Sequence, residues 1–140
     1  NTADVVKVLD ANSPEGIEVK NLHEDYAVLA LQGPKAAAVL HSLGIETTMD
    51  YMAFDYVSIA GVDVILCRTG YTGEHGFEIV PPWKDASRVW DTLIEAMQPF
   101  DGLVCGLGAR DTLRTEMGYP LHGHELSLDI TPVQARIAIN

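Results

Sequence analysis

Apolar and polar residues alternate through the middle of the chain with the two-residue period that is typical of strands. Residues 51–59 and 61–69 both follow this period, and the Ala60-Gly61 step between them predicts a hairpin turn. In the second strand, Val62, Val64 and Leu66 lie on the side opposite to Asp63, Ile65 and Cys67. Two antiparallel strands are therefore expected here.

Three further segments are apolar enough to form strands. The near-continuous apolar run over residues 26–32 is short enough to predict a buried strand, which Gly33-Pro34 ends. Residues 77–80 predict another strand, closed by Pro81-Pro82, and Ile17 with Val19 predicts a short strand near the start of the chain.

Helical periodicity marks four other segments. Residues 1–10, 35–43, 86–97 and 108–117 carry apolar side chains three and four residues apart. In the last segment the predicted core stripe consists of Ala109, Leu113 and Met117. Since strands and helices interleave and hairpins are favoured, we expect an α+β fold, a mainly antiparallel sheet with helices packed on one face.

Composition narrows the possible functions. The 140 residues include 20 acidic and 9 basic side chains, a formal charge of −11, which disfavours binding to nucleic acid or to anionic membranes. No apolar run approaches the roughly 20 residues of a membrane-spanning helix. The two cysteines, Cys67 and Cys105, are expected to be buried free thiols in a reducing compartment. The chain starts without Met or a signal peptide, so we expect it to begin inside a longer protein.

Two segments carry candidate chemistry. Residues 70–76 contain three glycines without the spacing of a phosphate loop, so this bend is either a tight turn or a place of close ligand approach. Glu78 follows it and should point away from the face that carries Phe77 and Ile79. Glu78 is then either an exposed carboxylate on an edge strand or an acceptor for a planar ligand with adjacent N–H groups, such as the pyrimidine edge of a pterin.

The second candidate is Arg110, which stands early in the predicted last helix. It either pairs with a nearby acid or donates two hydrogen bonds to a ligand carbonyl or carboxylate. Asp111 is expected to be favoured by the dipole at the helix start. The nearby His122, His124 and Glu125 lack the spacing of a zinc site, so no metal ligand is predicted.

Five blocks of this sequence, in this order, resemble the T-protein of the glycine cleavage system, the aminomethyltransferase family. The resemblance covers nearly the whole chain, and its second and third blocks are long and specific. The blocks are residues 29–36, 68–79 (RTGYTGEHGFEI), 105–114 (CGLGARDTLR), 118–126 and 129–132.

The resemblance implies a chemistry that spacing does not show. Enzymes of this family transfer the one-carbon unit of an aminomethyl group, carried on the lipoyl arm of a partner H-protein, to tetrahydrofolate with release of ammonia. The family's folate-binding glutamate and arginine fall on Glu78 and Arg110, and Tyr71 is expected to line the same site. Tetrahydrofolate and lipoylated H-protein are thus the implied substrate and partner. Bacterial cytoplasm and mitochondrial matrix both fit the family, and the cytoplasm is the expected location because the sequence shows no transit peptide.

The resemblance also implies an incomplete enzyme. Residues 1–126 correspond to the family's central α+β folate-binding domain, and residues 127–140 to a connector toward a C-terminal barrel domain that is absent here. The catalytic aspartate of the family would lie upstream of Asn1, so no catalytic residue is assigned, and the chain alone is expected to be inactive.

Three other interpretations remain open. The folate domain of a dimethylglycine or sarcosine dehydrogenase resembles the T-protein closely. Folate-binding proteins of tRNA modification carry a cysteine motif where this chain has Thr69-Gly70-Tyr71-Thr72, which disfavours that class. A packing domain that docks a partner through its acidic surface is the remaining alternative.

Overall fold

The computed structural model describes residues 2–137 and contains one four-stranded sheet. Its strands are β1 (Leu29–Gln32), β2 (Phe54–Ile59), β3 (Val62–Cys67) and β4 (Gly76–Val80). They lie in the order β1-β4-β3-β2, and every neighbouring pair is antiparallel. The antiparallel α+β fold expected from the sequence is confirmed.

The β2–β3 hairpin follows the predicted pattern. Ala60 and Gly61 both have positive φ, 53° and 73°, as a two-residue hairpin turn of the favoured twist requires. Along β3, Val62, Val64 and Leu66 are buried. The three residues that alternation groups on one side of this strand are thus the side that faces the core.

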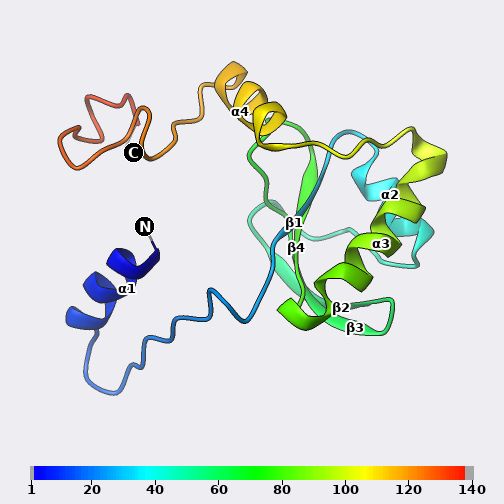
Figure 1. Cartoon of the computed structure of the whole chain (residues 1–140), viewed down its shortest axis with the longest axis horizontal. Helices are drawn as coiled ribbons and strands as arrows, with labels where there is room; N and C mark the ends of the chain where they lie inside the picture. Colours follow the sequence, from blue (N-terminus) through cyan, green and yellow to red (C-terminus); the bar gives the residue numbers. More distant parts are fainter. Residues whose placement is uncertain (1, 138–140) are drawn as a thin grey trace.

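Two helices cover one face of the sheet (Figure 1). They are α2 (Ala36–Ser42) and α3 (Ala86–Met97), and short 3-10 turns at Trp83–Asp85 and Gln98–Phe100 flank α3. Between them and the sheet lies a core that includes Leu40, Leu66, Phe77, Ile79 and Val89, each at most 2% exposed. Within residues 2–137 no helix covers the opposite face in this way, and Phe54 and Tyr56 on β2 are 62% and 72% exposed.

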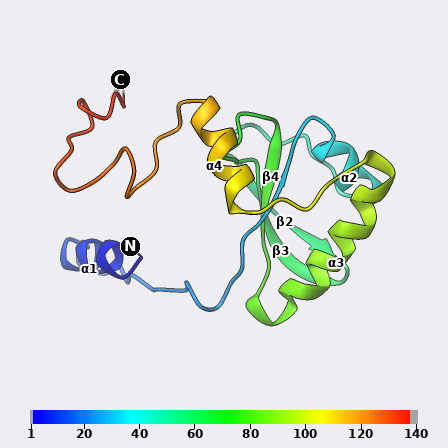
Figure 2. The ribbon, with the colours of Figure 1, turned by 45° about the horizontal axis from the view of Figure 1, so that its top comes forward.

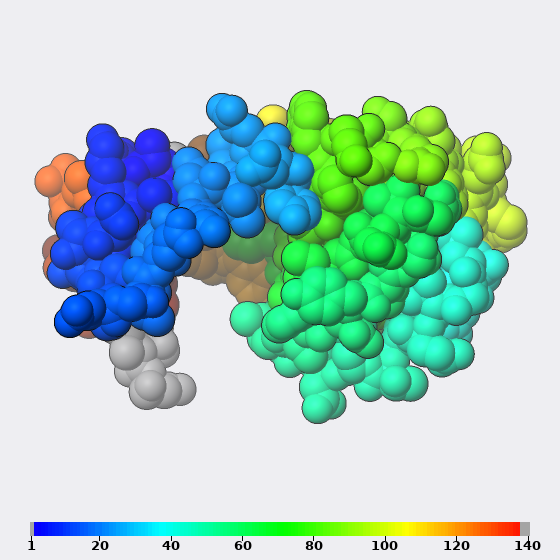
Figure 3. All heavy atoms as spheres, turned by 90° about the horizontal axis from the view of Figure 1, so that it is seen from below, coloured from blue at the N-terminus to red at the C-terminus, as the bar shows by residue number. Residues whose placement is uncertain are grey.

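The remaining two helices lie outside this core. The first, α1 (Thr2–Ala11), has no buried residue, and the first residue of its predicted range lies outside the described chain. The second, α4 (Leu107–Glu116), lies apart from α2 and α3 (Figure 2). Figure 3 shows the N-terminal residues, in blue, standing away from the body formed by the sheet and its helices.

Three expectations about elements were wrong. Ile17 and Val19 form no strand, because this segment has no neighbouring strand to pair with, and Ile17 is 63% exposed. The strand predicted over residues 26–32 is shorter and lies at the edge of the sheet, so it is only partly buried. The core stripe predicted for α4 is exposed: Leu113 and Met117 are 38% and 49% accessible, and Ala109 is exposed as well.

Candidate functional site

The glycine-rich bend between β3 and β4 is built around one amide side chain. Gln32, at the end of β1, donates from Nε2 to the carbonyl oxygens of Thr69 (3.2 Å) and Phe77 (3.0 Å). A Cβ atom added at Gly70 or Gly76 would overlap this amide. Both glycines therefore have a structural explanation, namely close approach of the Gln32 side chain.

Glu78 lies in the middle of β4 and is half-buried. Phe77 and Ile79 are buried toward the helices, so Glu78 points to the other face, as alternation predicted. Its Oε2 accepts a hydrogen bond from the Thr69 hydroxyl. Because a carboxylate has about four lone-pair positions, acceptor capacity remains for a further partner.

Glu78 also affects its neighbour across the sheet. Cys67 pairs with Glu78 in the β3–β4 register. Burial, with a smaller contribution from the Glu78 charge, raises the pKa of the Cys67 thiol above its ordinary value. Cys67 is half-buried and Cys105 is exposed, so the expectation that both thiols are buried was wrong.

Tyr71 and Arg110 lie against each other. The guanidinium carbon of Arg110 is 4.4 Å from the centroid of the Tyr71 ring, a cation–π contact. Arg110 is exposed, and among residues 2–137 no ion pair joins it to a carboxylate, so the salt-bridge alternative is not what the structure contains. Its N–H donors remain available to solvent or to a ligand.

The Tyr71 side chain is also in contact with the loop that follows α4. The rings of Tyr71 and Tyr119 have centroids 5.7 Å apart and are inclined by 33°. The Tyr71 hydroxyl donates to the carbonyl oxygen of Pro120. The bend and the loop after α4 thus form one aromatic wall beneath Arg110.

Arg114 is the buried residue of α4, and sequence reasoning missed it. It is 3% exposed, and its guanidinium contacts Asp111 (Nε to Oδ1, 2.8 Å) and Glu125 (Nη1 to Oε2, 2.6 Å). Hydrogen bonding to Asp111 above all raises the pKa of Arg114, and the Leu121 N–H, followed by Arg114, lowers that of Glu125. Asp111 therefore serves this ion pair and lies beyond the first turn of the helix.

The structure brings together two of the three predicted site residues. Tyr71 and Arg110 are in contact, whereas the described residues include no hydrogen bond or ion pair from Glu78 to either. Thr69 connects them, because its side chain binds Glu78 and its backbone leads through Gly70 to Tyr71. The grouping of these three residues as a folate site stays a prediction.

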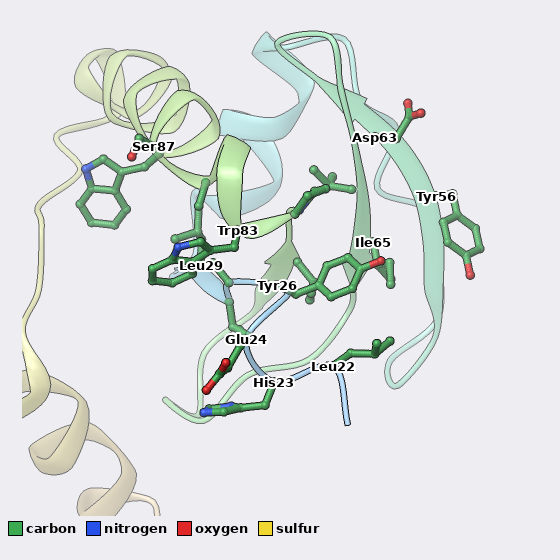
Figure 4. Close-up of a pocket in the computed structure, with 17 residues that line it drawn as sticks. Leu22, His23, Glu24, Tyr26, Leu29, Tyr56, Asp63, Ile65, Trp83 and Ser87 are labelled. Carbon is green, nitrogen blue, oxygen red and sulfur yellow. The ribbon is translucent and has the colours of Figure 1, made fainter. Parts of the chain in front are cut away.

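Among the surface hollows formed by residues 2–137, one adjoins the predicted site residues and a larger one lies elsewhere. A hollow of about 560 Å³ adjoins the site and is lined by Thr69, Gly70 and Tyr119, among others. Neither this hollow nor a second one of about 1640 Å³ is lined by Tyr71, Glu78 or Arg110, but only the smaller one borders the bend that carries Tyr71. Figure 4 shows this larger hollow, with Tyr26 and Trp83 near its middle and Tyr56 on the neighbouring strand. The smaller hollow is the better candidate, because polar groups converge there.

The histidines after α4 lie in a loop. In the described part of the chain, no group of three or more His, Cys, Asp or Glu side chains is placed to hold a metal ion. Glu125, the acid of this segment, accepts hydrogen bonds from Arg114 and from the Leu121 N–H.

None of the helices within residues 2–137 has the length and apolar character needed to cross a bilayer.

Comparison with known proteins defines the class of this α+β domain. A profile of the GCVT N-terminal domain matches residues 1–139, and the chain belongs to this family. The aminomethyltransferase of Mycobacterium tuberculosis is 60% identical over 136 residues, which are 97% of this chain and 37% of the relative. The aminomethyltransferase of Mycobacterium leprae is 57% identical over the same share of each chain. The chain thus spans little more than a third of the length of these relatives.

Solved structures show the same relationship. The glycine cleavage system aminomethyltransferase T from Bartonella henselae superposes with a TM-score of 0.77 at 33% identity, over 94% of this chain and 35% of that one. Heterotetrameric sarcosine oxidase from Corynebacterium matches with a TM-score of 0.60 at 25% identity, over 74% and 54%. The resemblance to the T-protein stated from sequence motifs is confirmed.

Proposed function

We propose that this chain is the folate-binding part of an aminomethyltransferase of the glycine cleavage system. The parent enzyme would transfer the one-carbon unit of an aminomethyl group on the lipoyl arm of an H-protein to tetrahydrofolate, releasing ammonia, in the cytoplasm. The observation that carries the proposal is the 60% identity to aminomethyltransferases over nearly the whole chain.

The geometry at the bend supports the folate part of this proposal. Glu78 is partly withdrawn from water, and Thr69 fixes one of its oxygens. The remaining acceptor capacity suits the ring N–H and amino group of a pterin, which donate side by side. Arg110 on the Tyr71 ring supplies planar donors for a carbonyl or carboxylate of the same ligand.

The chain's own residues would bind and orient the folate. Holding the reactants in the correct orientation in a site that excludes water is a large source of rate enhancement. A wall that binds and orients folate would therefore raise the reaction rate without supplying a side chain that reacts. We assign no catalytic residue to residues 2–137. The catalytic aspartate and any further folate contacts are proposed to come from other parts of the parent chain.

The test is a calorimetric titration of the full-length parent enzyme with 5-formyltetrahydrofolate. Glu78→Ala should weaken binding by about 1–3 kcal/mol, because the pterin N–H groups lose their acceptor. Asp63→Ala is the matched control, since Asp63 is an exposed carboxylate on the adjacent strand. Equal affinities of Glu78→Ala and the unaltered enzyme would remove Glu78 from the site.

A second candidate function rests on the structural match to sarcosine oxidase. In a sarcosine-oxidising enzyme a folate domain would receive its one-carbon unit from an oxidised amine. The lower identity, 25% against 60%, ranks this candidate second. Tetrahydrofolate-dependent turnover of sarcosine by the parent enzyme, without H-protein, would favour it.

A further inference from the structure

Helix α4 is attached to the rest of the molecule in an unusual way. Its buried residue is an arginine, and its apolar side chains Leu107 and Leu113 remain accessible. An apolar stripe normally fixes how a surface helix sits on its core. Besides the Met117 side chain, which lies against Gly73, polar contacts should therefore set the direction in which α4 presents Arg110.

Arg114 supplies these contacts to the loop after α4. Its Nη1 donates to the Tyr119 carbonyl oxygen (3.1 Å) and to Glu125 Oε2 (2.6 Å). The same Glu125 oxygen accepts the Leu121 N–H (3.0 Å). One guanidinium and one carboxylate thus close residues 119–125 into a loop beside the helix; we call this pair the Arg114–Glu125 clamp.

The clamped loop bears directly on the predicted ligand-binding wall. The Tyr119 ring packs on Tyr71, and the Pro120 carbonyl accepts the Tyr71 hydroxyl. Tyr71 in turn carries the Arg110 guanidinium on its ring. Arg110 and Arg114 are four residues apart on one helix, so the chain of contacts starts and ends on α4.

We infer that the Arg114–Glu125 clamp positions Arg110 for folate, through the loop and the Tyr71 ring. The clamp residues are positioning residues, because neither one need touch the ligand. This inference rests on the proposed function insofar as Arg110 is taken to bind folate. The placement of Arg110 on Tyr71 can be measured without any ligand.

The first measurement follows Arg110 itself in the ligand-free, full-length enzyme labelled with nitrogen-15 at arginine. A guanidinium stacked on an aromatic ring has a ring-current-shifted Nε–H resonance, which Tyr71→Leu would identify by abolishing the shift. Glu125→Gln and Arg114→Lys should move this resonance toward its position in Tyr71→Leu. An unmoved resonance in both variants would overturn the inference.

The second measurement is the affinity for 5-formyltetrahydrofolate together with steady-state kinetics for tetrahydrofolate. Glu125→Gln should raise Kd and KM about tenfold with kcat nearly unchanged, because binding rather than chemistry loses its support. Combined with Arg110→Gln, it should add little to the loss caused by Arg110→Gln alone, since both act through one group. Fully additive losses would contradict positioning through Arg110.

Controls separate the clamp from general stability and from the proposed function. Arg88→Lys alters another arginine–aspartate contact with i, i+3 spacing, on α3, and should leave both measurements unchanged. Should Arg114→Lys fail to fold, the milder Glu125→Gln carries the test, because glutamine removes the charge of the pair at nearly unchanged side-chain size. A moved resonance, with folate affinity unaffected by Arg110→Gln, would reject Arg110 as a folate ligand and leave its positioning intact.

Discussion

Gln32 shows how one side chain can organise three segments. It belongs to the edge strand β1, yet its amide bonds the strand β4 through Phe77 and the bend through Thr69 and Thr72. Backbone carbonyls that leave a sheet need such partners when water is excluded. The bend that carries Tyr71 is therefore held in place by a residue almost forty positions earlier in the chain.

Glycine at position 70 should be required for this arrangement. Gly70→Ala places a methyl group against the Gln32 amide and should lower the free energy of unfolding by about 1–3 kcal/mol. Gly108→Ala is the matched comparison, because Gly108 lies in α4 with open space around it. It should raise that free energy by about 0.5–1 kcal/mol. Urea unfolding of both variants measures the difference, and equal effects would contradict the close approach at Gly70.

At the scale of elements, the periodicity of apolar residues correctly predicted the strands and helices whose orientation is set by the burial of apolar side chains. The β2–β3 hairpin, the helix α3 and the outward direction of Glu78 followed from alternation and helical spacing. The same reasoning failed for α4, because it assigns apolar residues to the core and arginine to solvent. Burial of Arg114 depends on Glu125, eleven positions later, in a loop whose conformation local pattern does not specify. The contact of Arg110 with Tyr71 could not be predicted from local sequence pattern either, because it joins two segments about forty residues apart.

The attachment of α4 should depend on pH. The pKa of Glu125 lies below its ordinary value of 4.5, so the ionised form is the one that stabilises the fold. Its contribution is complete above the ordinary value and is lost as the pH falls through the lower, folded-state pKa. The stability gap between the unaltered protein and Glu125→Gln should therefore be larger at pH 7 than near pH 3.

Urea unfolding at the two pH values checks this expectation. Glu116→Gln is a suitable control, because it removes a carboxylate from the end of α4 and no ion pair of Glu116 is found in residues 2–137. That variant should show no comparable gap. A gap for Glu125→Gln that does not narrow on acidification would mean that the carboxylate charge is unimportant for the clamp.

At the scale of the whole molecule, the negative charges outnumber the positive charges that could pair with them. Twenty acidic side chains face nine basic ones, and the cations of the ion pairs in the described residues are exposed, apart from Arg114. Exposed pairs contribute little to stability. Repulsion among the remaining carboxylates should therefore exceed the attraction within pairs.

Salt should consequently stabilise this chain. Raising the ionic strength from about 0.01 M to about 0.15 M shortens the screening length from about 30 Å to about 8 Å and weakens repulsion over longer distances most. The urea midpoint at pH 7 should rise over this range. A falling midpoint would show that the ion pairs, rather than the net charge, dominate the electrostatic free energy of folding.

The turn at Ala60–Gly61 offers a practical use. A Cβ at Gly61 meets nothing within 4 Å, and β3 (Val62–Cys67) separates the turn from Thr69 and the bend by about 20 Å of extended chain. Exposed loop tips of this kind tolerate insertions better than any other part of a fold. A short affinity tag or a fluorophore attached there would allow the protein to be captured on a sensor surface with the proposed folate-binding wall directed into solution.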